Sequence, residues 1–394
     1  MKAALRPASP FAPLWGLDPD VAYLNHGSYG ACPRHVLDYQ AELRAELERE
    51  PVDFLTRQLS GRLAEARRAI GPFVGADPDD LAFVANATSG VNAVLRSLPI
   101  QPGDELLTTD HVYGACGKAL RYAAARAGAL VRVAAVPFPL EHEDQIVAPV
   151  LAAVTPRTRL ALLDHVTSVT GLIFPIERLV SELHARGVPS LVDGAHALGM
   201  VPLDLDALGA DYYSANAHKW LCAPKGAAIL HVRRERQAGL HPLVISHGYV
   251  PAGAFRDEFD WTGTADPTAW LSIAESVRFL GALLPGGWPE LMARNHALAV
   301  EARQVLCDAI GTSPACPRSW LGALASVPLP PAAPGSPAAR LDADGLSGWF
   351  RERGIETWLH PWGAGGRVIR ASAQLYNSRE QFVALGEALG EALA

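Results

Sequence analysis

Short apolar runs alternate with segments of helical periodicity along the first two thirds of the chain. Seven runs are rich in β-branched and aliphatic residues, at 81–86, 105–111, 130–137, 159–166, 189–196, 210–217 and 226–232. Helical patterns lie between most of them, as at 90–98, 114–127 and 175–187. Strands that are apolar throughout and separated by helices are typical of a mainly parallel sheet covered on both faces. The last two runs are too close for a crossover helix, so we expect one antiparallel edge.

The pattern changes after about residue 262. Helical periodicity over 268–284 and 288–310 leads to a stretch rich in Pro and Ala, 328–340, which we expect to be an exposed loop without a core face. A short α/β segment and a final helix follow. The sequence therefore predicts an α/β fold with a large domain over 16–262, built on a mainly parallel seven-stranded sheet. It also predicts a smaller α+β domain over 263–394, with segment 1–15 packing near it.

Composition narrows the class of protein. The chain has 394 residues, is 49% hydrophobic and 19% charged, and carries a net charge of −7 without blocks of like charge. These values exclude a disordered chain and argue against a nucleic-acid or membrane partner. The five cysteines form no C-x-x-C pair, so we expect neither a disulfide framework nor a metal site. Since no signal peptide or long apolar run is present, we expect a cytoplasmic enzyme.

A lysine after the sixth apolar run is the first candidate for chemistry. Lys219 lies in SANAHKWLCAPKG (214–226), among apolar and aromatic residues. Burial disfavours the charged form of an amine, and a neutral amine can form a Schiff base with an aldehyde. Taken alone, the segment fits equally well a strand-end lysine that reaches solvent.

A carboxylate ends the preceding run. In LVDGAHALG (191–199) the apolar residues end at Asp193, on the strand before Lys219. The carboxyl ends of parallel strands face the ligand crevice, and a pyridine-ring cofactor needs an anionic partner for its protonated nitrogen. Asp193 by itself could be a helix N-cap. Together with Lys219 it predicts a cofactor site.

A third stretch has the composition of a phosphate site. In NATSGVNAVL (86–95) a strand end is followed by small and hydroxyl residues and then by a helix. Backbone N–H groups at a helix start, with the hydroxyls of Thr88 and Ser89, can bind phosphate, although the same stretch also fits an ordinary N-cap. Neither a P-loop nor a dinucleotide glycine pattern occurs in the sequence.

These motifs together resemble those of a known family. NATSGVN, TTDHVYGA, LVDGAHALG and NAHKWLCAPKG, in this order, are similar to the class V aminotransferase family of pyridoxal 5′-phosphate (PLP)-dependent, fold type I enzymes. YLNHGSYG, HKWLCAPKG and WTGTADPTAWL resemble its isopenicillin N epimerase-like branch. The resemblance covers about residues 15–390 and implies the fold type I architecture, PLP as cofactor and an amino acid substrate.

The resemblance implies a role for each matched residue. Lys219 is expected to form the Schiff base with PLP, and Asp193 to pair with the pyridine nitrogen. His196 is expected at the phenolic oxygen of the cofactor, where relatives often carry Gln. The other expected cofactor contacts are Ala87, Thr88 and Ser89 in the phosphate turn, Asn216 (Ser in relatives) and His218 beside the lysine, and Thr264.

The resemblance further implies a stacking residue, a carboxylate site and a dimer. His111 lies where relatives stack an imidazole on the cofactor, and Tyr113 is the alternative stacker or acid. Arg370 matches the arginine that binds the substrate α-carboxylate, with Asn25 as a second contact. Thr264 matches a residue that reaches the phosphate from the neighbouring subunit, so we expect a homodimer with shared active sites.

The reaction depends on which groups move protons at the α-carbon of the substrate. Lys219 is the expected base, and reprotonation on the other face gives epimerisation or racemisation of an amino acid or peptide-linked amino acid, the reaction we favour. The second acid stays open among Tyr113, His26 and water. A C–S lyase or an aminotransferase is the alternative. A desulfurase is not expected, because the window 317–394 lacks the cysteine that would act as nucleophile.

Overall fold

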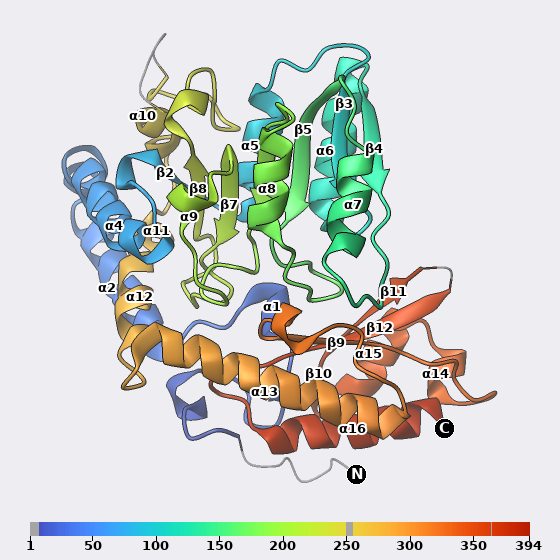
Figure 1. Cartoon of the computed structure of the whole chain (residues 1–394). Helices are drawn as coiled ribbons and strands as arrows, with labels where there is room; N and C mark the ends of the chain where they lie inside the picture. Colours follow the sequence, from blue (N-terminus) through green and yellow to red (C-terminus); the bar gives the residue numbers. More distant parts are fainter. Residues whose placement is uncertain (1–7, 250–254, 364) are drawn as a thin grey trace.

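The computed structural model describes residues 8–249, 255–363 and 365–394 of the chain. Residues 1–7 of the expected N-terminal segment lie outside the described residues. A large α/β part carries one sheet, and a smaller part near the C-terminus carries a second, with the long helix α13 (Gly287–Ile310) running along it (Figure 1).

Each of the seven apolar runs contains or overlaps one strand of a single sheet, as predicted. The strands lie in the order β2-β8-β7-β6-β5-β3-β4. All neighbours pair in parallel except β8, which is antiparallel to both β2 and β7, so the antiparallel strand is one position in from the edge. Their bounds are β2 Leu81–Val84, β3 Glu105–Thr109, β4 Leu130–Ala134, β5 Thr158–Asp164, β6 Ser190–Asp193, β7 Tyr212–Asn216 and β8 Ala228–Val232.

Both faces of this sheet are buried except at the edge strand β4, whose side chains are mostly exposed, and this burial explains why the inner strands are rich in apolar residues. Successive residues of β5 belong to different cores: Leu162 packs on the face covered by α5 and α6, and Leu163 on the face covered by α7 and α8. The covering helices are α5 Ala87–Ser97, α6 Gly114–Ala127, α7 Asp144–Ala152, α8 Ile176–His184 and the short α9 Leu205–Leu208 and α10 Phe255–Asp260.

A group of helices flanks the β2 side of the sheet (Figure 1). It joins segments that are far apart in sequence, because α11 and α12 pack against α2 and α4. The first two helices after residue 262 therefore pack with N-terminal helices. The bounds are α2 Arg34–Arg49, α3 Pro51–Asp53, α4 Leu59–Val74, α11 Thr268–Leu271 and α12 Ile273–Gly281.

The smaller part is an antiparallel sheet backed by helices. Its strands lie in the order β11-β12-β9, and α13 packs against α16 to close a core around Leu306, Phe350 and Phe382. The bounds are β9 Leu324–Pro328, β11 Trp358–Trp362, β12 Gly366–Ser372, α14 Pro337–Arg340, α15 Ala343–Arg351 and α16 Arg379–Leu393.

The expectation of a plain exposed loop over 328–340 is wrong in its second half. Residues Pro337–Arg340 form α14, in which the Ser336 side chain accepts the N–H of Ala339 as an N-cap. Ala338 is buried and belongs to the core of the smaller part. Pro at the first helical position is compatible with a helix start, so the Pro-rich composition did not exclude a helix.

The N-terminal chain packs against the smaller part first and only then enters the large part. Strand β1 (Ala22–Tyr23) pairs in parallel with β10 (Ile355–Glu356), and the next helix, α1 (His26–Tyr29), lies between the large sheet and the smaller part (Figure 1). Residues 22–29 thereby come to lie beside the carboxyl ends of the large sheet's strands. Among the described residues, no helix is both long and apolar enough to span a membrane.

We expect a buried ion pair between α4 and α10 to be a strong stability determinant. NH1 and NH2 of Arg67 donate to Oδ1 and Oδ2 of Asp260 at 2.6 and 2.8 Å, and the Arg67 and Asp260 side chains are 4% and 14% exposed. Asp260→Ala leaves a buried unpaired charge and should lower the free energy of unfolding by about 3 kcal/mol or more. Glu182→Ala removes the exposed partner of Arg186 and should cost about 0.5 kcal/mol or less. Equal losses in denaturant melts of the two variants would contradict this expectation.

Candidate active site

Lys219 lies in a turn directly after β7 and is almost completely buried. Its neighbour Trp220 is fully buried in the main core, which holds the turn against the protein interior. Burial, assisted by the positive charge of Arg370, lowers the pKa of the Lys219 amine to about 8. The amine is therefore partly neutral near physiological pH, as a nucleophile for an aldehyde must be.

The hydrogen bonds of His196 favour the neutral form of the Lys219 amine. The Nε1–H of Trp220 donates to Nδ1 of His196 at 3.3 Å, and Nε2 of His196 lies 3.2 Å from Nζ of Lys219. Since an indole N–H is only a donor, Nδ1 must accept, and a neutral imidazole then carries its proton on Nε2. Burial lowers the pKa of His196, which favours that neutral form. Nε2–H therefore donates to the lone pair of a neutral Lys219 amine.

Asp193 occupies the end of β6, as the sequence predicted. Its Oδ1 accepts the N–H of Ala195 at 3.0 Å, and its Oδ2 accepts the thiol of Cys116 at 3.1 Å. Burial raises the pKa of this carboxyl, and these hydrogen bonds and the charge of Lys219 oppose the rise. A cationic ring nitrogen placed here would gain a buried anionic partner.

The phosphate turn forms the N-terminus of α5. Asn86 caps the helix by accepting the N–H of Ser89 at 2.8 Å, and Oδ1 of Asn216 accepts the N–H of Ala87 at 2.8 Å. Asn216 thus holds the start of the helix through its oxygen and keeps its amide NH₂ as a donor. The arrangement leaves a helix N-terminus, with the Thr88 hydroxyl, beside the other site residues.

His218 lies in the turn after β7, directly before Lys219. Nδ1 of His218 donates to the carbonyl of Ala227 at 3.1 Å, and burial lowers the pKa of the imidazole to about 4, so it is neutral at pH 7. Thr264 is exposed on the surface.

The structure brings Tyr113, rather than His111, next to Lys219. The Tyr113 ring centroid lies 6.0 Å from Nζ of Lys219. His111 is instead held by Thr170, whose Oγ1 is 2.8 Å from Nδ1, and by the carbonyl of Val136, 3.1 Å from Nε2. The Tyr113 ring therefore lies near the reactive amine, and both ring nitrogens of His111 have hydrogen-bond partners.

Arg370 is a buried guanidinium without a carboxylate partner among the described residues. Its NH1 donates to the carbonyl of Ser168 at 2.5 Å and to Oγ of Ser168 at 3.4 Å, and its NH2 donates to Oγ of Ser28 at 3.1 Å and to Oδ1 of Asn25 at 3.4 Å. Its Nε is buried without a hydrogen-bond partner in the described part of the chain. The guanidinium carbon lies 4.2 Å from the ring centroid of Trp358. Since a buried charge is normally paired, and this one has only neutral partners among the described residues, an incoming carboxylate could supply the missing counter-ion.

His26 is committed to structure and is thereby a poor candidate for the second acid. Its Nδ1 is 2.8 Å from the hydroxyl of Tyr376, and its Nε2 is 3.0 Å from the carbonyl of Lys219. Complete burial lowers the pKa of His26 to about 3. The helix α1 that carries His26 ends at Tyr29, and Gly30 is its C-cap. A side chain is excluded at Gly30, because φ is +72° and a Cβ would lie 1.9 Å from the carbonyl oxygen of His218.

The described residues fit PLP. PLP needs an amine for its aldehyde, an anion for its ring nitrogen and donors for its phosphate, and the chain offers a partly neutral amine after β7, a buried carboxylate at the end of β6 and a helix N-terminus after β2. Sequence reasoning missed two members of this cluster, Cys116 and Asp164. Asp164 ends β5 in register with Asp193, so its position at a strand end was the signal that could have revealed it.

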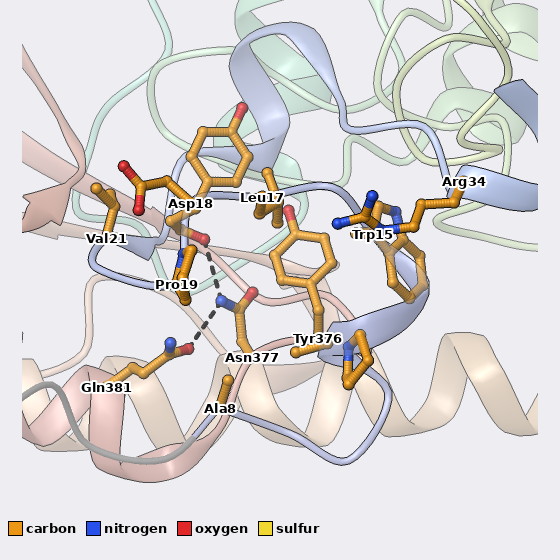
Figure 2. A pocket seen from close by; sticks show the side chains of 13 residues that line it. Ala8, Trp15, Leu17, Asp18, Pro19, Val21, Arg34, Tyr376, Asn377 and Gln381 are labelled. Carbon is orange, nitrogen blue, oxygen red and sulfur yellow. Dashed lines mark hydrogen bonds between the residues drawn. The ribbon is translucent and has the colours of Figure 1, made fainter.

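A separate cavity of about 410 Å³ lies behind this site, between the N-terminal segment and the start of α16 (Figure 2). Trp15, Tyr23 and Tyr376 supply aromatic walls, and Asn377 donates to the carbonyl of Tyr23 and to Gln381. Tyr376 divides the cavity from Lys219, because its hydroxyl bonds to His26, which in turn bonds to the lysine carbonyl.

Comparisons with known proteins agree with this geometry. The model of the class V aminotransferase family matches residues 32–385. Isopenicillin N epimerase of Streptomyces clavuligerus is 36% identical over 95% of each chain. The epimerase of Amycolatopsis lactamdurans is 37% identical over 95% of this chain and 96% of its own. A protein named as a probable chloroplastic L-cysteine desulfhydrase of Arabidopsis thaliana is 31% identical over 94% of this chain and 83% of its own.

Solved structures share the fold at low identity. The cystine C–S lyase C-DES, in complex with cysteine persulfide, superposes with a TM-score of 0.79 at 20% identity, covering 95% of this chain and 99% of that chain. A cysteine desulfurase from Thermococcus onnurineus gives a TM-score of 0.81 at 19% identity and 99% coverage of both chains. The predicted family resemblance and the fold type I architecture are confirmed.

The lowered pKa of Lys219 predicts how the apoprotein captures PLP. Because only the neutral amine reacts, the capture rate should rise about tenfold per pH unit below about pH 8 and level off above it. Stopped-flow absorbance after addition of PLP to apoprotein measures this rate, with Lys219→Ala as the baseline. A rate that keeps climbing to the ordinary lysine pKa of 10.5 would refute a buried, partly neutral amine.

Proposed function

Because the chain belongs to the class V aminotransferase family, we propose that it is a PLP-dependent enzyme that removes the α-proton of an amino acid or a peptide-linked amino acid and returns a proton to the same carbon. PLP is the cofactor, and when bound it supplies the electron sink that weakens bonds at the α-carbon. Binding, orientation and proton movement are the work of the chain's own residues.

The observation that carries the proposal is the unpaired guanidinium of Arg370. An α-carboxylate can accept from its NH groups in a bidentate fork and can also meet the amide of Asn25. The positive charge of Arg370 also acts on Lys219, the proposed base, and helps burial to lower the pKa of its amine to about 8. A substrate carboxylate held by Arg370 is therefore brought to the side of the molecule where a partly neutral amine can accept the α-proton.

Epimerisation needs a second group that gives a proton, and Tyr113 is the side chain best suited to that role. Burial raises the pKa of its hydroxyl, so it is protonated at neutral pH. It is 40% exposed, so the hydroxyl can exchange protons with solvent. The isopenicillin N epimerases support this reaction through their identity to the chain over nearly its full length.

A C–S lyase is the second candidate, and the same tyrosine favours it. Loss of a thiol from the β-carbon requires an acid at the leaving sulfur, which a protonated Tyr113 can be. Relatives named for cysteine desulfhydrase activity match over most of the chain. A desulfurase-type nucleophile is absent, since 317–394 contains no cysteine. An aminotransferase is the third possibility within the family.

We further propose a homodimer with shared active sites, operating in the cytoplasm. The exposure of Thr264 suits a residue that reaches the phosphate of a neighbouring subunit. The five cysteines are all free and buried, which suits a reducing compartment.

Deuterium exchange distinguishes these reactions. The holoenzyme is incubated in D₂O with a panel of L-amino acids and no keto acid, and the products are analysed by chiral mass spectrometry. Inverted, α-deuterated product is the expected result. Pyruvate, ammonia or a released thiol would establish a lyase, and exchange with retention a transaminase. Lys219→Ala should abolish exchange and the exposed-lysine variant Lys118→Ala should not, whereas exchange that survives Lys219→Ala would refute the assigned base.

The carboxylate site can be tested on the reactive substrate found in that panel. Arg370→Lys replaces the planar fork by a point charge and should raise KM by roughly tenfold to a hundredfold. Arg367→Lys is the matched control, because Arg367 lies on the same strand but donates to the carbonyls of Ala338 and Leu341. An unchanged KM in Arg370→Lys would contradict the assignment.

A further inference from the structure

Two carboxyl groups lie side by side at the ends of neighbouring strands. Asp164 ends β5 and Asp193 ends β6, and the two residues are directly paired in the parallel ladder. Each is only 2% exposed. Asp193 has a role as the partner of the cofactor's ring nitrogen, but nothing in the proposed reaction uses Asp164. A second buried acid at this place is expensive and calls for a function of its own.

Asp164 is bonded to the start of α6. Its Oδ1 accepts the backbone N–H of Tyr113 at 3.2 Å, and Tyr113 is the residue that immediately precedes the helix. The Tyr113 side chain makes no capping bond to the helix, so a group from elsewhere must fix this turn. The other oxygen, Oδ2, is buried and has no hydrogen-bond partner among the described residues.

The turn that Asp164 holds carries two groups of the site. The ring of Tyr113 lies beside Lys219, with its centroid 6.0 Å from Nζ. One helical turn later, the Cys116 thiol donates to Asp193 at 3.1 Å. A displacement of the first turn of α6 would therefore move the stacking ring and the thiol together.

We propose that Asp164 is a positioning residue of the cofactor site: by accepting the Tyr113 N–H it fixes the first turn of α6 and so sets the Tyr113 ring against the cofactor plane. The inference rests on the proposed cofactor chemistry, in which Tyr113 is the stacking residue. It assigns Asp164 no contact with substrate and no proton transfer.

The raised pKa of Asp164 agrees with a carboxyl group that serves as a hydrogen-bond acceptor rather than as a charged group. The groups around it are Asp193 on β6, Lys219 after β7, and Tyr113 and Cys116 on α6. Burial, and then the neighbouring charge of Asp193, raise the pKa of Asp164, while Lys219 and the Tyr113 N–H oppose the rise. Two buried carboxylates cannot both ionise at low cost, and the raised pKa of Asp164 favours its neutral form. An uncharged isostere with an acceptor oxygen should therefore replace it.

PLP binding to the apoprotein provides the test without any substrate. Asp164→Asn keeps the acceptor oxygen, and its dissociation constant for PLP should stay within about twofold of the wild type. Asp164→Leu keeps the number and branching of the side-chain heavy atoms but loses the acceptor, and should weaken binding about tenfold and reduce the visible circular dichroism of bound PLP. Tyr113→Ala should do the same. The double variant Asp164→Leu/Tyr113→Ala should lose about tenfold, not a hundredfold, because both changes remove one ring contact.

Asp211→Leu is the matched control for the cost of replacing a buried acid. Asp211 also accepts a backbone N–H, from Ser190, but at the opposite ends of the strands from Lys219. Its replacement should lower the melting temperature and leave the affinity for PLP unchanged. The proposal is overturned if Asp164→Asn loses as much affinity as Asp164→Leu, if the two losses add in the double variant, or if Asp164→Leu or Tyr113→Ala binds PLP as the wild type does. If the PLP affinities of the single and double variants are as expected but the holoenzyme shows no deuterium exchange, the proposed reaction is overturned and the role of Asp164 is not.

Discussion

The desolvation of Lys219 is the constraint on which the rest of the site depends. An amine at this position is useful only if it is partly neutral, and the chain achieves that by burying it behind Trp220 and beside the positive Arg370. The same burial makes any neighbouring polar group that is left unpaired costly. His196 is therefore fixed in one tautomer, and Asp193 is stabilised by a thiol and a backbone N–H.

Local patterns were sufficient to predict the large sheet and its chemistry-bearing ends. Most of the strands are rich in apolar residues, so they stood out from the helices around them, and Asp193 and Lys219 became candidates because they lie at or just after the ends of such strands. The phosphate turn was readable because an N-cap has a local signature. These features depend on neighbours within a few residues, which is the range over which a single sequence is informative.

Features that depend on distant contacts or on side-chain direction were out of reach. The turn after β3 presents both His111 and Tyr113, and a single sequence does not reveal that His111 bonds to Thr170 while the Tyr113 ring lies near Lys219. The pairing of β1 with β10 joins residues more than 300 positions apart. The short α14 was hidden because its buried contact is a single alanine inside a Pro-rich stretch.

The route of the N-terminal chain has a consequence for how this molecule can be divided. Residues 22–29 are hydrogen-bonded to the smaller part through β10 and supply Asn25 and Ser28 to Arg370, while Gly30 rests on the backbone of His218. The surroundings of Arg370 are thus composite, built from the two ends of the chain. In a chimaera between relatives, the exchangeable module is the C-terminal part together with residues 22–30, because a graft of either alone would separate Arg370 from the side chains that orient it.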